Sequence, residues 1–269
     1  MTDTATTADP AAEHWRTYDE FAAGIDTFRL PSASLDGTMM RLHGEDGTVL
    51  EMSFAAEEVT WSARGPLLTE SGAVDPYDAV AVREGVLFLN LPLESRERTA
   101  LTIVASAQTN RAVIVLSRIQ PEAPDAAPQV TQRFVAAVTD GGPAQGESPT
   151  QSRDLIGKRN LYRYSPEHLY EHVYLSSQRY SWQCLEGVQR GHGDTDLSTV
   201  WKLDEGLYVF CFREFRIAVA SVWLHDLGYQ LRTTGIFLGL NGSGDAEHSR
   251  AGGHIYPLGA VAYPDAQPI

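Results

Sequence analysis

The stretch Val82-Arg-Glu-Gly-Val-Leu-Phe88 has a close counterpart in Leu203-Asp-Glu-Gly-Leu-Tyr-Val209, 121 residues later in the chain. A second pair of segments, Val59-Thr-Trp-Ser62 and Tyr180-Ser-Trp-Gln183, has the same spacing, and a third short pair matches at a spacing of 120. Three matches at one near-constant spacing predict an internal repeat. We therefore expect two copies of one folding unit along the chain.

Each copy consists of short runs of Val, Leu, Phe, Tyr and Trp separated by turn-forming residues, as in Val49–Phe54 and Ala112–Leu116. Such runs indicate β-strands, and helical periodicity is nearly absent. A copy of about 90 residues, at about 8–12 residues per strand and turn, holds about eight antiparallel strands. Eight strands close into a small barrel, so we expect an all-β protein of two tandem antiparallel β-barrels, with one fused sandwich as the alternative.

The composition along the chain predicts five segments. Residues 1–29 form an N-terminal arm that is partly disordered, because its beginning is rich in Thr, Ala and Asp. Residues 30–120 form the first, degenerate barrel, and residues 154–240 form the second barrel, which holds the candidate site. Residues 121–153, rich in Pro and Gly, are expected to be a linker, and residues 241–269 a C-terminal tail.

The charge of the chain excludes several classes of partner. The 269 residues include 21 Lys and Arg against 35 Asp and Glu, a net charge of −14, which repels nucleic-acid phosphates and argues against a basic membrane-binding surface. The acidic start of the chain does not resemble a signal peptide, and Ile217–Leu224, the longest apolar stretch, is shorter than the ~20 residues that span a bilayer. We therefore expect a cytoplasmic protein with no nucleic-acid or membrane partner. With only two cysteines, a disulfide scaffold is excluded.

Aromatic and titratable side chains are concentrated in the second copy, which points to a site there. Tyr162 and Tyr164 lie two residues apart and share one face of a strand, where the first copy has Leu42 and Gly44. Two hydroxyls on one inward face could bind an oxygen atom of a substrate. The alternative is that both rings only pack, as tyrosines on half-buried strands commonly do.

A later strand of the second copy ends at Glu214. Tyr208, Phe210 and Phe212 precede this residue on the same face of the strand. If the face points inward, the carboxyl lies beside a low-dielectric wall. Burial then raises its pKa, which suits a general acid or base. The alternative places Glu214 in solvent, paired with a neighbouring arginine.

Several histidines could also take part in chemistry. His192 lies in the loop Arg190-Gly-His-Gly-Asp194 and is a candidate catalytic residue at a barrel mouth, although a loop histidine is more often merely exposed. His168 and His172 are four residues apart, which in an extended strand is ~13 Å, too far to bind one ion. We therefore expect no metal site.

Longer motifs in both copies carry a family resemblance. They are Leu155-Ile-Gly-Lys-Arg-Asn-Leu-Tyr162, Tyr170-Glu-His-Val-Tyr174 and Arg179-Tyr-Ser-Trp-Gln-Cys184 in the second copy, and Asp75-Pro-Tyr77 and Leu116-Ser-Arg-Ile119 in the first. On these motifs the chain resembles the molybdenum-cofactor-biosynthesis F (MoaF) family over about residues 15–240. The resemblance implies a calycin-type, lipocalin-like double barrel and a link to molybdenum cofactor synthesis.

The second copy also resembles, more distantly, the bacterial phenolic acid decarboxylases. The matching residues are Gly157-Lys158, Tyr162 and Tyr164, Tyr170-Glu171 and Phe212-Arg-Glu214. The resemblance implies that the paired tyrosines hold a substrate carboxylate and that Glu214 handles protons. The chain departs from this family where His192 stands in place of a functional arginine, which puts decarboxylation itself in doubt.

Together these features predict a cofactor-independent acid/base enzyme of the lyase or isomerase type, acting on a small, aromatic or conjugated carboxylate or enolate. The expected catalytic residues are Glu214, Tyr162, Tyr164 and His192. The expected substrate-binding residues are Tyr174, Trp182, Tyr208, Phe210, Phe212 and Arg190. The alternatives are a non-catalytic small-molecule-binding protein, accessory to molybdenum cofactor synthesis, and an interaction module in which the first barrel docks a partner. A homodimer is compatible with each of them.

Overall fold

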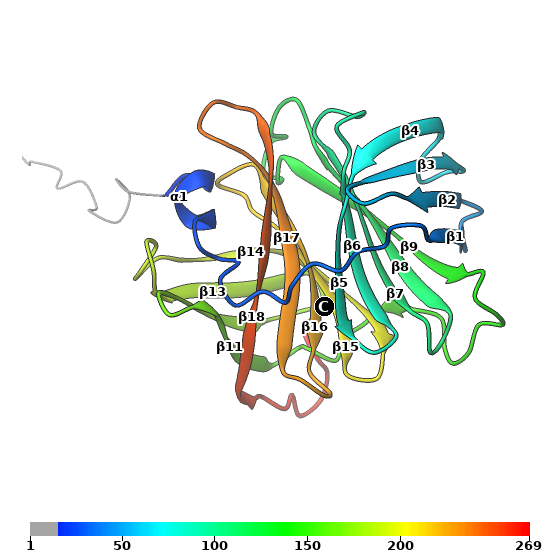
Figure 1. Cartoon of the computed structure of the whole chain (residues 1–269). Coiled ribbons are helices and arrows are strands. Elements are labelled where there is room, and N and C mark those ends of the chain that lie inside the picture. The colour runs from blue at the N-terminus through cyan, green and yellow to red at the C-terminus, as the bar shows by residue number, and fades with distance from the viewer. Residues whose placement is uncertain (1–15) are drawn as a thin grey trace, which may run out of the picture.

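The computed structural model describes residues 16–269, which form two antiparallel β-sheets lying side by side (Figure 1). The strands of the first sheet are β1 (Met39–Gly44), β2 (Val49–Phe54), β3 (Glu58–Arg64), β4 (Glu70–Pro76), β5 (Asp78–Arg83), β6 (Val86–Pro92), β7 (Thr99–Ser106), β8 (Arg111–Ile119) and β9 (Val130–Thr139). Those of the second are β10 (Thr150–Gln151), β11 (Lys158–Ser165), β12 (His168–Tyr174), β13 (Arg179–Glu186), β14 (Gly193–Asp204), β15 (Leu207–Arg213), β16 (Val219–Asp226), β17 (Arg232–Leu240) and β18 (Ala246–Ala260). The one helix in residues 16–269 is α1 (Tyr18–Ala22), which is too short to cross a membrane.

The second sheet is a closed barrel of the eight strands β11 to β18. Consecutive strands pair from β11 to β18, and β18 returns to pair with β11. The pairing of β14 with β15 completes the ring, and β10 adds a short strand at the edge of β14. The predicted eight-stranded antiparallel barrel is therefore confirmed for the second copy.

The first sheet has the same strand succession but stays open, as a curled half-barrel with β4 and β5 at its two edges. In the second copy, the long strand β14 pairs with β13 and with β15, and Leu197 pairs with residues of both. The corresponding part of the first copy is interrupted between Pro76 and Asp78, so that β4 pairs with β3 and β5 pairs with β6. Proline has no N–H to donate to a neighbouring strand, which explains why the ring does not close here.

The structure corrects two of the expected segments, the linker and the C-terminal tail. The expected linker 121–153 contains β9, which is an interior strand of the first sheet between β1 and β8. The expected tail 241–269 contains β18, which pairs with both β11 and β17. Each of these strands follows a loop rich in Pro or Gly. Because such loops resemble linkers in composition, the expected repeats end one strand too early. In the N-terminal arm, residues 1–15 lie outside the described residues, whereas α1 packs against the second barrel.

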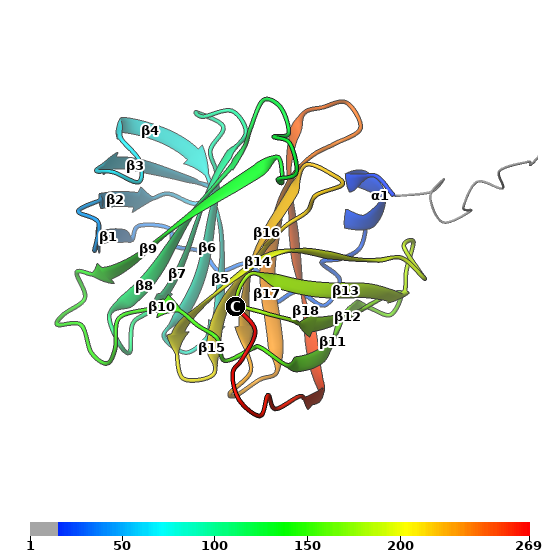
Figure 2. The ribbon, with the colours of Figure 1, turned by 180° about the vertical axis from the view of Figure 1, so that it is seen from behind.

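The two sheets are joined through an aliphatic layer. Outward-facing residues of the first sheet, such as Phe88 and Val104, cluster with Leu207, Val209 and Leu224 of the second. Figure 2 shows the two sheets from behind, with β5 to β8 beside β14 to β17. The insides of the two units differ, because the first is filled mainly by aliphatic side chains and the second mainly by aromatic ones. The sheets therefore share one interface and keep separate interiors.

The repeat extends to matching side-chain hydrogen bonds. In the first copy, Trp61 Nε1 donates to Asp75 at 2.7 Å, and the same carboxylate accepts the Ser95 N–H at 2.7 Å. In the second copy, Trp182 Nε1 donates to Asp196 at 2.9 Å, and that carboxylate accepts the Phe215 N–H at 3.2 Å. Each unit thus fixes one turn, after β6 in the first and after β15 in the second, to a buried tryptophan, which confirms the repeat by structure.

Candidate functional site

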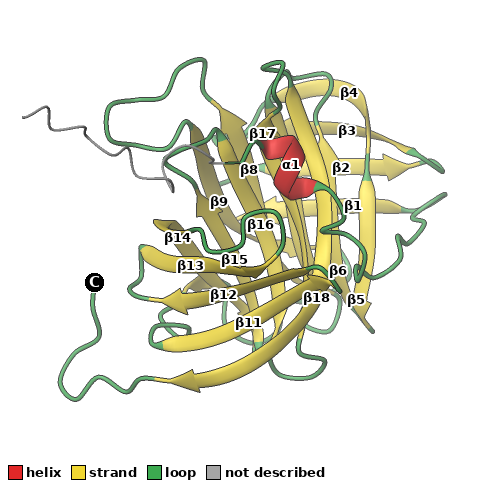
Figure 3. Cartoon of the chain, turned by 90° about the vertical axis from the view of Figure 1, so that its left-hand side faces the viewer, coloured by secondary structure: helices red, strands yellow, loops and turns green. Residues whose placement is uncertain are grey.

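A small cavity of about 40 Å³ in the second barrel is lined in part by Phe21 of α1. Figure 3 shows this helix beside the strands of the barrel. The cavity is lined by aromatic rings, a carboxyl, an imidazole and an amide. The lining residues are Phe21, Ile25, Tyr164, Tyr170, His172, Tyr180, Trp182, Gln189, Phe212, Glu214, Trp223 and Phe237. Space of this size holds a few waters or a small chemical group, but not an aromatic acid.

The N-terminal segment closes one end of this barrel. Tyr18 and Phe21 of α1 are buried, and the Phe21 ring meets Phe237 edge-on with centroids 5.3 Å apart. Tyr18 lies directly over Gly239, where a Cβ atom would collide with its ring. A glycine in a strand often marks a place where another group approaches the backbone closely, and here that group is the Tyr18 ring. The helix α1 is therefore packed into this end of the barrel, and we call it the plug.

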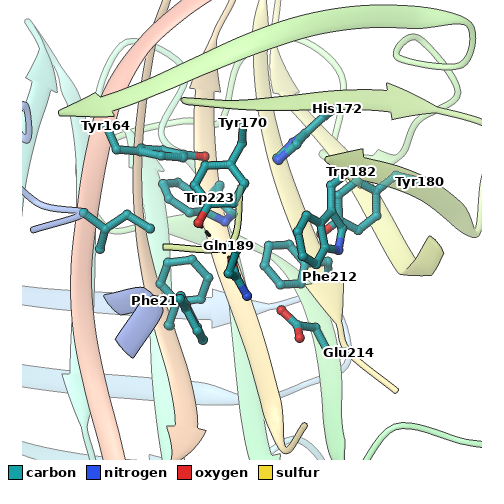
Figure 4. A pocket seen from close by; sticks show the side chains of 12 residues that line it. Phe21, Tyr164, Tyr170, His172, Tyr180, Trp182, Gln189, Phe212, Glu214 and Trp223 are labelled. Atoms are coloured by element: carbon teal, nitrogen blue, oxygen red, sulfur yellow. Dashed lines mark hydrogen bonds between the residues drawn. The ribbon is translucent and has the colours of Figure 1, made fainter. Parts of the chain in front are cut away.

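Glu214 points into the cavity from the turn that follows β15 (Figure 4). Burial raises the pKa of its carboxyl well above the ordinary value, and the nearby Asp196 and Asp194 carboxylates raise it further. In residues 16–269 no ion pair engages this carboxyl. The alternative of a solvent-exposed Glu214 paired with a neighbouring arginine is therefore wrong: Arg213 donates to Gln132 and Thr199, and Arg216 pairs with Asp194.

Asp196 holds two walls of the cavity in place. Its carboxylate accepts the hydrogen bond of the Trp182 indole and the backbone N–H of Phe215, the residue after Glu214. Burial raises the pKa of Asp196 to about 6, against the lowering effect of the Trp182 hydrogen bond. Asp196 therefore positions both Trp182 and Glu214.

Two buried nitrogen atoms on cavity-lining residues have no hydrogen-bond partner in the described part of the chain. They are Nδ1 of His172 and Nε1 of Trp223. Burial lowers the pKa of His172 to about 3, so its ring is neutral near pH 7. Unpaired buried polar groups are costly, and in native proteins each calls for an explanation such as catalysis or an ordered ligand.

Tyrosine and glutamine side chains complete the polar wall. The Tyr170 hydroxyl donates to Oε1 of Gln189 at 2.9 Å, drawn as a dashed line in Figure 4. Gln189 is buried although it lies in the β13–β14 loop. Tyr164, on β11, lines the same space, and burial raises the pKa of its hydroxyl well above 10. The phenols are therefore neutral hydrogen-bonding groups at physiological pH.

The structure brings together four of the residues that the sequence singled out. Glu214, Tyr164, Trp182 and Phe212 all line the cavity. They come from β11, β13, β15 and the turn after β15, and they face inward because alternate residues of a barrel strand do so.

Three further expected residues lie inside the barrel but away from the cavity. Tyr162 and Tyr174 join their hydroxyls at 2.6 Å, and Tyr174 also contacts Nε2 of His225 at 3.1 Å. Nδ1 of His225 is in turn 2.8 Å from the hydroxyl of Thr233. Phe210 packs against both Tyr174 and His225. The structure does not bring Tyr162 and Tyr164 together at the cavity, because Tyr164 lines it whereas the Tyr162 hydroxyl belongs to this buried chain.

The last three expected residues lie elsewhere. The Tyr208 hydroxyl donates to Asp154 at 2.9 Å, near Lys202. Arg190 is exposed, and His192 is half-buried in the same loop without lining the cavity. The loop turns Gln189 inward instead, because its backbone closes with hydrogen bonds from Gly191 and His192.

Sequence reasoning missed several lining residues. Tyr170 and His172 were available from the two-residue period of β12, where both fall on the inward face. Phe21 and Gln189 lie in segments with no strand period, so no local pattern places them in the barrel. In residues 16–269 no three His, Cys, Asp or Glu side chains gather into a set that could hold a metal ion.

Two family models match the chain, one over each unit. The family model of the MoaF N-terminal domain matches residues 13–121, and that of the MoaF C-terminal domain matches residues 149–261. Protein MoaF of Klebsiella aerogenes is 35% identical over 206 residues, which cover 72% of this chain and 76% of that protein. A solved structure of a "putative beta-lactamase" from Burkholderia vietnamiensis covers 40% of this chain and all of its own, with 15% identity and a TM-score of 0.34.

Proposed function

Starting from the fact that this chain belongs to the MoaF family, we propose that its second barrel binds a small conjugated acid or enolate and that Glu214 acts there as general acid and base. The observation that carries the proposal is the convergence of unpaired polar groups on one cavity. The Glu214 carboxyl has no counter-cation, and His172 Nδ1 and Trp223 Nε1 have no hydrogen-bond partner in residues 16–269.

The raised pKa of Glu214 supports this role. A carboxyl whose pKa is raised by burial keeps its proton to higher pH than an exposed one, so it can donate that proton to a substrate and take one back as carboxylate. The Tyr164 hydroxyl and the neutral His172 ring would hydrogen-bond the oxygen on which negative charge develops. Proton transfer with oxyanion stabilisation is sufficient for lyase or isomerase chemistry.

Access to the site depends on the plug. A cavity of about 40 Å³ does not admit a ring-sized ligand while Phe21 and Ile25 form its roof. We therefore propose that α1 moves away when such a ligand enters. The ring of the bound ligand would take the place of these side chains and keep water out of the barrel mouth. The pKa of Glu214 would then stay raised in the complex.

The test is a ligand panel of hydroxycinnamate-type and polyketide-type acids, measured first by thermal stabilisation of the full chain. Acids that raise the melting temperature are then followed by ultraviolet absorbance for turnover and by proton NMR in D₂O for exchange of ligand protons. Glu214→Gln is expected to retain binding and to lose turnover or exchange by about 100-fold or more. Glu84→Gln, at an exposed turn of the first unit, is the matched control and is expected to behave as the wild type.

The second candidate function is non-catalytic binding, as an accessory of molybdenum cofactor synthesis. The small size of the cavity and the predominance of aromatic rings in its wall favour it. Stabilisation of the wild-type chain by a ligand, with neither turnover nor exchange, would select this candidate. Equal turnover in the wild type and in Glu214→Gln would contradict the acid/base role.

A further inference from the structure

The first unit has a groove at the end that corresponds to the plugged mouth of the second. The groove measures about 950 Å³ and lies between the β3–β4 loop, the β6–β7 turn, the end of β8 and the start of β9. Strand registers relate Leu116 here to Phe237 of the second cavity, and Leu68 and Gln189 lie in the corresponding loops, β3–β4 and β13–β14. The two sites are therefore the same place in the two copies.

Four arginines line this groove, in a chain whose net charge is −14. Arg96 pairs with Glu70 at 3.1 Å, and Arg98 lies 3.4 Å from Glu97. The other two, Arg118 and Arg133, have no acidic partner within 4.0 Å in the described residues. Glu97 is the one acidic side chain among the lining residues, so the groove has a local excess of positive charge.

The two unpaired arginines are held in different ways. The guanidinium of Arg133 donates to the backbone carbonyls of Leu67 at 3.2 Å and Pro66 at 3.0 Å, which fixes it at the rim and leaves further N–H groups free. The exposed side chain of Arg118 makes no hydrogen bond in the described part of the chain and stands between Thr99 and Thr131 on the neighbouring strands. Fixed and free guanidinium groups on one concave surface suit recognition of carboxylate or phosphate oxygens.

The second copy shows that these arginines are not needed for the fold. By strand register, Gly239 and Ser249 of the second copy take the places of Arg118 and Arg133. The Tyr18 ring covers Gly239, and its hydroxyl lies 3.4 Å from the Glu247 carbonyl oxygen. The same mouth is thus filled by an aromatic plug in one copy and surrounded by arginines in the other.

From this placement we infer that the groove of the first unit is a binding site for a small, multiply charged oxyanion, with Arg118 and Arg133 as the principal contacts. The volume is that of ordinary small-molecule sites. Selection of an anion by an acidic protein requires local contacts, because the net charge opposes its approach. The site is separate from the cavity of the second barrel, so it is independent of the function proposed there.

The test is calorimetric titration of the full chain with pyrophosphate and with citrate at low ionic strength, with acetate as the singly charged comparison. Pyrophosphate and citrate both carry several negatively charged oxygen atoms. The anion that binds with the higher affinity shows whether the site prefers phosphate or carboxylate oxygens. Arg118→Ala is expected to weaken binding about tenfold or more, and Arg118→Lys to weaken it less. Arg190→Ala removes the same charge from an exposed loop of the second unit and is expected to bind as the wild type.

Circular dichroism establishes that each variant is folded. Arg118 is the residue to replace, because its side chain makes no hydrogen bond in residues 16–269 and its loss should leave the fold unchanged. Replacement of Arg133 would also remove its hydrogen bonds to the β3–β4 loop. The inference is overturned if neither pyrophosphate nor citrate binds the wild type, if Arg118→Ala binds them unchanged, or if Arg190→Ala weakens binding equally. Glu214→Gln is expected to leave this binding unchanged.

Discussion

The two copies share one framework and differ in what they place inside it. Leu93 and Glu214 occupy the same position, because the N–H of each donates at 3.0 Å to the carbonyl of the first residue of the next strand. This residue is Thr99 of β7 in the first copy and Val219 of β16 in the second. Both turns are held by an aspartate that also binds a tryptophan indole. The framework therefore tolerates either a leucine or a glutamic acid at this point.

The inward faces of the strands diverge in the same manner. Strand register relates Leu50 and Met52 of the first copy to Tyr170 and His172 of the second. The first unit is a dry aliphatic interior, and its chemistry-bearing residues lie at the mouth. The second unit has polar groups within an aromatic interior, closed by a plug. Burial of polar groups costs stability unless they are paired, so the unpaired polar groups of the second unit should lower its stability.

The largest effect is expected from transferring the carboxyl to the first unit. Leu93→Glu replaces a buried leucine among aliphatic neighbours and should destabilise the chain by about 4 kcal/mol near neutral pH, in chemical denaturation. The loss should shrink at low pH, where the new carboxyl is neutral. Leu93→Met is the volume-conserving control and should cost less than about 1.5 kcal/mol. Wild-type stability of Leu93→Glu would show that position 93 is not the dry equivalent of position 214.

The converse change removes the charge from the second unit. The folded-state pKa of Glu214 lies above its ordinary value of 4.5, so the stability that this group contributes is fully present only below about pH 4.5. This contribution should be lost as the pH rises through the folded-state pKa of Glu214. Glu214→Gln cannot ionise, so its free energy of unfolding should exceed that of the wild type increasingly from pH 4.5 to pH 8. Parallel pH profiles for the two proteins would mean that the carboxyl is solvated.

A smaller effect is expected from the plug. Gly239→Ala places a methyl group against the Tyr18 ring and the Val219 side chain, which should cost about 2 kcal/mol and loosen residues 16–29. Limited proteolysis should cut this segment faster than in the wild type. Gly72→Ala is the matched control in the first unit, since a Cβ there meets nothing within 4 Å. Unchanged protection of the segment in Gly239→Ala would contradict the plug.

The smallest effect concerns the buried hydroxyl chain, which the first unit lacks because Leu42 stands where the second has Tyr162. Tyr162→Phe should cost about 1 kcal/mol in denaturant unfolding, the usual net value of a buried hydrogen bond. The double variant Tyr162→Phe/Tyr174→Phe should cost less than the sum of the two single changes, because both lose the same hydrogen bond. Additive costs would show that the two hydroxyls are not coupled.

The repeat, the β-strands and the richer chemistry of the second copy could be predicted from the sequence. These features depend on residue spacing and on the two-residue period of a strand, and both are local. Position 214 was identified for the same reason, as the end of an inward-facing row. Closure of the ring was predicted for both copies, but the first copy is open at Pro76. Closure depends on a backbone N–H at this position that can pair with a distant strand, and proline has none.

The contents of the cavity depended on contacts between segments far apart in the chain. Phe21 and Gln189 enter it from a helix and a loop, and no local pattern gives their direction. Tyr162 and Tyr164 share a strand face, but only the packing of neighbouring strands decided which hydroxyl found a partner. A period fixes the side of a strand to which a residue points. Its depth in the barrel, and whether its polar atoms are paired, are fixed by residues from other strands.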